Sequence, residues 1–169
     1  MKFLVVGLGS MGKRRIRCLK VLDQENIIGV DIRKDRRDEA TRLFNIKTLE
    51  SLEKAYINCK PDAVLVCNNP VQHAADIKEA ISYDCHVFSE ISIIPDGMDE
   101  IISASSKKKL VVAASSTLRF KEPIKKLKSM LQEECIGKVY AYDYHVGQYL
   151  RDWHPWEDIR DFFVSNPRT

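Results

Sequence analysis

The chain has 169 residues, of which 44% are hydrophobic and 30% are charged. These proportions exclude a disordered or low-complexity chain, and at about 150 residues per domain the length holds one complete domain with a remainder too short for a second. The formal net charge of +3 gives no electrostatic reason to expect nucleic acid or an anionic membrane surface as a partner.

Targeting signals and cysteine patterns are weak in this sequence. No apolar run approaches the ~18 residues of a membrane span, and the apolar stretch at the N-terminus is too short for a signal peptide. The five cysteines are odd in number and scattered, without a C-x-x-C pair, so neither a disulfide framework nor a metal site is predicted. We therefore expect a protein of the reduced cytoplasm with no membrane segment.

Short apolar runs alternate with longer amphipathic runs from residue 3 onward, which predicts an α/β fold with a doubly wound parallel sheet. Thr48 is placed to cap one of the helices, and Pro70 with Asn69 before it marks the start of another. The predicted strands are 3–6, 27–31, 63–67, 86–90 and 110–114, and the predicted helices are 11–22, 36–44, 49–58, 70–83 and 97–107.

The alternation stops after residue 114. Residues 121–134 have the apolar stripe of an amphipathic helix, and the alternating pattern of 138–146 predicts a strand with three tyrosines and Val146 on one face. A long strand without a later partner strand is an exposed edge, and an isolated strand is not stable in water. The strand therefore needs a cover that the rest of the sequence does not provide.

We interpret this pattern as two domains. Residues 1–120 form the first, and residues 121–169 form the connecting helix and first strand of an incomplete second α/β domain for substrate binding or oligomerisation. The apolar face of the strand predicts either a homo-oligomer built through Tyr140 to Val146 or disorder of the tail.

A glycine-rich turn carries the clearest functional signal. Gly7-Leu8-Gly9-Ser10-Met11-Gly12 is a G-x-G-x-x-G that follows a predicted strand and opens a predicted helix. In such a loop the first glycine makes the tight turn, the second lets the backbone approach a pyrophosphate, and the third lets the helix pack closely. The helix N-terminus then offers unpaired N–H groups to the anion. The alternative is a tight turn without a ligand.

Asp31 ends the second predicted strand and lies 19 residues after Gly12, where an acid is expected to bind a ribose 2′-hydroxyl. A carboxylate repels a 2′-phosphate, so the sequence favours NAD as the cofactor. Arg33, Lys34 and Arg36 follow at once and could neutralise such a phosphate, so NADP stays possible. We include Arg33 with Asp31 in the predicted cofactor site.

Further polar residues follow other predicted strands, at the sheet edge where α/β proteins bind ligands. Asn68, Asn69, Pro70 and His73 come after the third clear strand, and Glu90 ends the next. We predict that all five belong to the cofactor site. The alternatives are a surface or capping histidine for His73 and a cap or loop anchor for Glu90.

Several short motifs occur in a fixed order. They are the glycine loop with Asp31, Lys60-Pro61-Asp62-Ala63-Val64, Asn69-Pro70-x-x-His73, Val87-Phe88-Ser89-Glu90, Thr117-Leu118-Arg119-Phe120 and the stretch 137–158. Together they resemble the glucose-fructose oxidoreductase and inositol dehydrogenase family of NAD(P)-dependent sugar oxidoreductases, and the stretch 137–158 looks like members from bacterial surface-sugar pathways. The resemblance implies a dinucleotide-binding domain, an α/β domain that covers the substrate, and a cofactor contact for Glu90.

The sequence departs from the family pattern in two places. Ile91 follows Glu90 where relatives have a lysine beside the nicotinamide, and nothing after Val146 matches the family's catalytic Asp-x-x-x-His motif. The leading hypothesis is the cofactor domain of an oxidoreductase that moves hydride between NAD(P) and a sugar or nucleotide-sugar hydroxyl. The departures favour a second hypothesis, a non-catalytic dinucleotide-binding subunit or sensor. A third is another nucleotide-binding enzyme, such as a methyltransferase.

Overall fold

The computed structural model describes residues 1–91, 95, 97–153, 155, 158–160 and 163–165. Residues 154, 156 and 157 of the motif stretch 137–158 lie outside the described residues. Contacts within the chain separate it into one compact unit up to Ser115 and a second from Ser116 onward. The predicted domain boundary after residue 120 stays a prediction.

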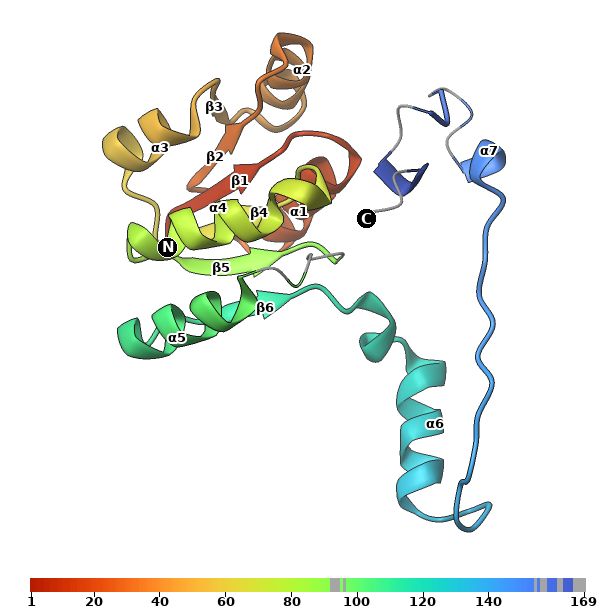
Figure 1. Ribbon diagram of the computed structural model, residues 1–169. Coiled ribbons are helices and arrows are strands. Elements are labelled where there is room, and N and C mark those ends of the chain that lie inside the picture. The colour runs from red at the N-terminus through yellow and green to blue at the C-terminus, as the bar shows by residue number, and fades with distance from the viewer. Residues whose placement is uncertain (92–94, 96, 154, 156–157, 161–162, 166–169) are drawn as a thin grey trace. The chain divides into compact units, whose positions relative to one another are not determined.

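A six-stranded sheet forms the centre of the first unit (Figure 1). Its strands are β1 (Phe3–Val6), β2 (Ile27–Val30), β3 (Lys47–Leu49), β4 (Ala63–Val66), β5 (His86–Ser89) and β6 (Val112–Ala114). They lie in the order β3-β2-β1-β4-β5-β6, and all neighbouring pairs are parallel. The chain therefore starts at the middle of the sheet with β1, adds β2 and β3 on one side, and then adds β4, β5 and β6 on the other. This order is that of the Rossmann fold and confirms the predicted α/β class.

Helices cover both faces of this sheet. They are α1 (Ser10–Val21), α2 (Lys34–Phe44), α3 (Leu52–Cys59), α4 (Pro70–Ser82) and α5 (Met98–Lys108). Side chains alternate between the faces along β1, so Val5 packs in one core with Ile16 of α1 and Ala40 of α2. Leu4 and Val6 point into the other core, with residues of α3, α4 and α5. Each face of the sheet is thus sealed by its own helices.

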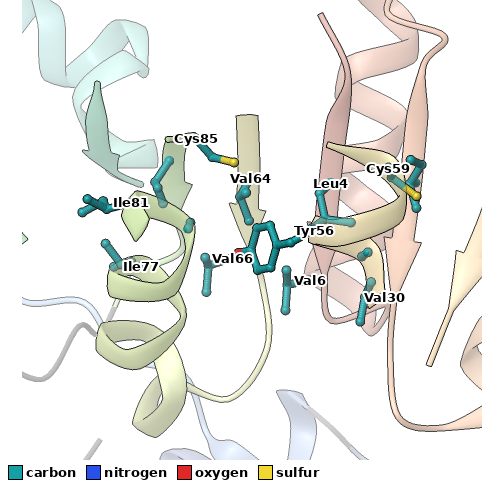
Figure 2. Packing of buried hydrophobic residues seen from close by; sticks show 14 of the residues in the cluster. Leu4, Val6, Val30, Tyr56, Cys59, Val64, Val66, Ile77, Ile81 and Cys85 are labelled. Atoms are coloured by element: carbon teal, nitrogen blue, oxygen red, sulfur yellow. The ribbon is translucent and has the colours of Figure 1, made fainter. Parts of the chain in front are cut away.

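Tyr56 of α3 is the largest fully buried side chain of the second core. Figure 2 shows its ring beside Val6, Val64 and Val66 of the sheet. The ring also stacks on Tyr83, with 4.4 Å between the ring centroids. Within the described part of the chain its buried hydroxyl has no hydrogen-bond partner, and burial raises the pKa of that hydroxyl well above its ordinary value. Tyr56 therefore stabilises this core by apolar packing alone.

The structure corrects the sequence interpretation around residue 48. The prediction of a helix over 49–58 capped by Thr48 is wrong, because residues 47–49 form β3, with Thr48 opposite Gly29 in the sheet. The helix starts later, where the Ser51 hydroxyl accepts a hydrogen bond from the N–H of Lys54. A strand of three residues is too short to show the alternating pattern of a strand. The helical spacing of the apolar residues that follow can therefore be read as starting at residue 49, within the strand.

The second unit contains short helices, which are η1 (Thr117–Phe120), α6 (Glu122–Gln132), α7 (Leu150–Trp153) and η2 (Phe163–Ser165). The prediction of a strand over 138–146 is wrong, because these residues carry no strand assignment. No other strand occurs among the unit's described residues, so the backbone of 138–146 has no ladder to join. The tyrosines of this segment are exposed, with 86% exposure at Tyr140 and 88% at Tyr142.

A search of the described residues finds no helix that is long and apolar enough to cross a membrane.

Removal of the Tyr56 hydroxyl tests the packing role of this ring. We expect Tyr56→Phe to leave the free energy of unfolding unchanged or to raise it by up to about 1 kcal/mol, since it removes a buried group without a partner. Tyr56→Ala is expected to cost about 3–5 kcal/mol through the cavity that it opens. Chemical denaturation measures both values.

The matched control is Tyr83→Phe, which keeps the ring stack and alters a hydroxyl on a residue that is 42% exposed. We expect it to be neutral. A loss above about 1 kcal/mol in Tyr56→Phe alone would mean that the hydroxyl has a stabilising partner.

Candidate functional site

The turn between β1 and α1 brings three backbone segments into close contact. Gly7 has a φ of +87°, and a β-carbon there would lie 2.8 Å from the backbone of Asn68 at the end of β4. A β-carbon at Gly12 would lie 1.8 Å from the carbonyl oxygen of Gly7. Both positions therefore need glycine. At Gly9 a β-carbon would meet the end of the flexible Arg36 side chain, 3.5 Å away, and not another backbone segment.

The N-terminus of α1 is open to an anion. Gly9 is the N-cap, no side chain caps the helix, and the first turn holds no acidic residue. Ser10 is exposed and begins the helix, and Met11 is half-buried. The first N–H groups of the helix and its positive dipole end are therefore available to a bound phosphate. This is the arrangement that the glycine spacing predicts.

Asp31 lies directly against this turn. One carboxylate oxygen accepts a 2.8 Å hydrogen bond from the N–H of Leu8, and the other accepts one of 2.9 Å from the N–H of Arg33. The Leu8 side chain is buried in the core, so Leu8 contributes its backbone to the site. Each carboxylate oxygen has a second lone pair for a hydroxyl donor. The structure thus brings Asp31 and the glycine loop together, as the sequence predicts.

The basic residues after Asp31 point in different directions. The Arg33 guanidinium pairs with Asp35, 2.5 Å away, and is half exposed. Arg37 donates to the carbonyl oxygen of Asp31. Arg36 turns toward the loop, where its Nη1 lies 3.7 Å from the Asp31 carboxylate. The Arg33 backbone therefore supports Asp31, while its side chain engages a carboxylate of its own helix.

Asn68, Asn69 and Pro70 form the turn from β4 into α4, beside Gly7. Asn69 caps the helix through a 3.1 Å bond from the N–H of Val71, and Pro70 occupies its first turn, which confirms the predicted start. The Asn68 amide donates to the Asp76 carboxylate at 2.6 Å. Burial raises the pKa of Asp76, and this hydrogen bond opposes the rise. Two side-chain hydrogen bonds therefore hold this turn where it contacts the glycine loop.

His73 lies behind this turn, with only 1% of its surface exposed. Its Nε2 lies 3.1 Å from the carbonyl oxygen of Asn68, and burial lowers the pKa of the imidazole. The neutral ring therefore donates Nε2–H to that carbonyl. The surface position that the sequence leaves open for His73 is wrong. Its contribution to a ligand site passes through Asn68, whose backbone it holds.

Glu90 directly follows β5, and its N–H continues the ladder by donating to Val66. Its carboxylate is 2.5 Å from Nε of Arg15, and both side chains are largely buried. Arg15 also donates to the Ser115 hydroxyl at 3.1 Å and lies 4.9 Å over the Phe88 ring. Glu90 thus lies at the sheet edge as a carboxylate whose charge is paired with that of Arg15.

Sequence reasoning missed Arg15 and Ser115. A signal for Arg15 exists, since it lies three residues after Gly12 on a helix that packs against the sheet, and a buried Glu90 needs a cation. The thiol of Cys67 is buried close to the Glu90 carboxylate. Burial, and then the negative charge of Glu90, raise the pKa of this thiol to about 12. Cys67 is therefore an uncharged core residue at this edge.

Comparisons with known proteins agree with this geometry. A model described as the oxidoreductase family with an NAD-binding Rossmann fold matches residues 1–116. The myo-inositol 2-dehydrogenase of Thermotoga maritima is 28% identical over 145 residues, which cover 83% of this chain and 43% of that protein. The chain thus spans less than half the length of this relative.

Solved structures show the same fold at lower identity. The WlbA dehydrogenase from Bordetella pertussis, in complex with NADH and UDP-GlcNAcA, is 16% identical with a TM-score of 0.76, over 83% of this chain and 43% of that one. KijD10, a 3-ketoreductase from Actinomadura kijaniata in complex with NADP and TDP-benzene, is 19% identical with a TM-score of 0.71, over 82% and 44%.

Alanine at two of the glycines separates packing from ligand access. We expect Gly12→Ala to lower the free energy of unfolding by more than about 2 kcal/mol, because its β-carbon collides with the Gly7 carbonyl. Gly9→Ala is expected to fold normally, since Gly9 has an ordinary extended backbone, but to weaken NADH binding about tenfold, because a methyl group would separate the backbone from a pyrophosphate. Thermal unfolding and fluorescence titration measure the two effects. Equal NADH affinity for Gly9→Ala and the native chain would contradict this assignment.

The buried His73 makes stability depend on pH. Its pKa is lower in the folded chain than the unfolded value of 6.5, so the unfolded chain binds more protons between the two values. Stability from this group is present above pH 6.5 and is lost as the pH falls toward the folded pKa, by at most about 1.4 kcal/mol per pH unit. His73→Gln should flatten this slope in denaturation at pH 5.5 to 7.5, whereas His145→Gln, at an exposed position, should not.

Proposed function

Because the chain belongs to the oxidoreductase family with an NAD-binding Rossmann fold, we propose that it is the cofactor-binding part of an enzyme that moves hydride between NAD(P) and a sugar or nucleotide-sugar hydroxyl. The observation that carries this proposal is the Asp31 carboxylate fixed on the N–H of Leu8, beside Gly9 at the N-terminus of α1, where no side-chain cap is found. A carboxylate beside an uncapped helix N-terminus supports the proposal, because a dinucleotide needs an acceptor for its ribose next to donors for its pyrophosphate.

In this proposal, the two ends of the site bind different parts of the cofactor. Gly9, Ser10 and the N-terminus of α1 would bind the pyrophosphate, and Asp31 the adenosine ribose. The turn at Asn68, with Glu90 at the neighbouring strand end, would position the nicotinamide half. The bound cofactor supplies the hydride acceptor or donor, and the residues of this chain orient it.

The substrate class has support from the relatives. WlbA is described in complex with UDP-GlcNAcA and KijD10 with TDP-benzene, both nucleotide-linked molecules. The curated relative is a dehydrogenase of the polyol inositol. These similarities favour a hydroxyl of a sugar or nucleotide sugar as the reacting group. A role in bacterial surface-sugar biosynthesis, in the cytoplasm, is the setting that we propose for it.

One observation favours a second candidate function. Ile91 follows Glu90, is 68% exposed and cannot donate a proton. It stands where the family pattern has a lysine. Without that polar group the chain fits a dinucleotide-binding subunit or sensor that does not itself turn over substrate. The two candidates share the cofactor site and differ in turnover.

We also propose self-association through the segment Tyr140 to Val146. Its large apolar side chains are exposed, with 70% exposure at Val146 and 86% at Tyr140. An exposed apolar surface of this kind is commonly covered by a partner chain. A second copy of this chain would supply that cover.

Fluorescence titration of the 169-residue chain with NADH tests the proposed function. We expect saturable binding at millimolar cofactor or below, and weaker binding by Gly9→Ala. A folded chain that shows no saturable binding would refute the proposal, and a preference for S-adenosylmethionine would indicate a methyltransferase-type site. Reduction of NAD with a sugar or nucleotide sugar would exclude the non-catalytic alternative.

A further inference from the structure

Arg15 and Glu90 form a largely buried ion pair at the carboxyl edge of the sheet. Their side chains are 16% and 11% exposed, and Nε of Arg15 lies 2.5 Å from the Glu90 carboxylate. The guanidinium is also fixed by the Ser115 hydroxyl, to which it donates at 3.1 Å, and by the Phe88 ring beneath it. The N–H of Glu90 donates to the carbonyl oxygen of Val66. The negative charge of Glu90 is therefore held at short range from a positive one.

The order of the strands places this pair on one side of the glycine loop (Figure 1). The loop follows β1, and Asp31 follows β2 on one side of it. Glu90 follows β5, which lies beyond β4 on the other side. A dinucleotide has a nucleoside at each end of its pyrophosphate. With the adenosine ribose at Asp31, the nicotinamide half therefore extends past β4 toward Glu90.

The oxidised and reduced forms of the cofactor differ in charge at this end only. The nicotinamide ring is a cation when oxidised and neutral when reduced, whereas the pyrophosphate and both riboses are the same in the two forms. An unpaired carboxylate near the ring would attract the oxidised form selectively, and salt screens such an attraction little in a largely buried site. The guanidinium of Arg15 opposes that attraction, because it brings an equal positive charge to the same place.

We propose that Arg15 determines how tightly this site binds the oxidised cofactor relative to the reduced one, by pairing with Glu90 and cancelling its attraction for the charged nicotinamide ring. The inference rests on the proposed function, because it concerns the same cofactor site. The glycine loop and Asp31 cannot supply this selectivity, since they face parts that both forms share. Arg15 acts through Glu90 and is thus a positioning residue.

A purely structural role for the pair predicts a different result. If Arg15 and Glu90 only joined α1 to the end of β5, loss of either side chain would loosen the site and weaken both forms of the cofactor by the same factor. The ratio of the two affinities would then stay constant. Only a charge effect shifts this ratio, and it shifts the ratio in opposite directions when the cation or the anion is removed.

The test measures the Kd of the 169-residue chain for NADH by fluorescence titration, and for NAD⁺ by displacement of bound NADH, at one pH and ionic strength. We expect Arg15→Gln to lower the ratio of the NAD⁺ Kd to the NADH Kd at least about fivefold, and Glu90→Gln to raise it by a similar factor. The double replacement should return the ratio to within about twofold of the native value. Arg17→Gln removes the same charge from an exposed position of α1 and should change the ratio less than about twofold.

Thermal unfolding shows which variants are folded, and the ratio is compared among those. An unchanged ratio in Arg15→Gln and Glu90→Gln overturns the inference and leaves the proposed function intact. Shifts of the same sign in both variants also overturn it, because they come from altered packing. Where one single variant does not fold, the sign of the shift in the other decides. A folded native chain that binds neither form refutes the proposed function together with this inference.

Discussion

The close approach of backbone at Gly7 and Gly12 is the constraint on which the rest of the site depends. The carbonyl of Gly7 lies where a side chain on Gly12 would stand, and Gly7 itself lies against Asn68. This contact fixes α1 against β1 and β4 and leaves its N-terminus facing outward. Since α1 also carries Arg15, the same contact sets where the cation meets Glu90. One steric fit thus positions both ends of the candidate site.

The same geometry determines how the charges at the candidate site are compensated. The carboxylates at the two ends are not free charges, because Asp31 accepts backbone N–H groups and Glu90 pairs with Arg15. Among the described residues, the N-terminus of α1 has no side-chain cap, and the Arg36 guanidinium, 3.7 Å from Asp31, is 35% exposed. A ligand with a diphosphate is therefore attracted to the turn, while the two acids remain available as local hydrogen-bond acceptors. A site with two unpaired carboxylates would repel such a ligand.

Most of the fold could be predicted because its signals are local. Most of the strands are short runs of mainly apolar residues, and glycine spacing with Asp31 defines a loop whose geometry is set by sterics. The strand at Lys47–Leu49 was missed because its pairing with Ile28 to Val30 is a tertiary contact. The strand over 138–146 was wrongly predicted for the same reason. Alternation shows that a segment can join a sheet, but only a partner strand makes it one.

The site residues also differ in whether local sequence or tertiary contacts determine their position. Positions in turns and helix caps, such as Gly9 and the capping side chain of Asn69, follow from sequence because their contacts are short-range. Charged side chains do not, because their direction depends on which opposite charge folding brings near. Arg33 and Arg36 are neighbours of equal chemistry, yet one turns to Asp35 and the other to Asp31. The direction of each charged side chain at this edge is therefore decided by its tertiary partner, a level of detail that motif spacing does not contain.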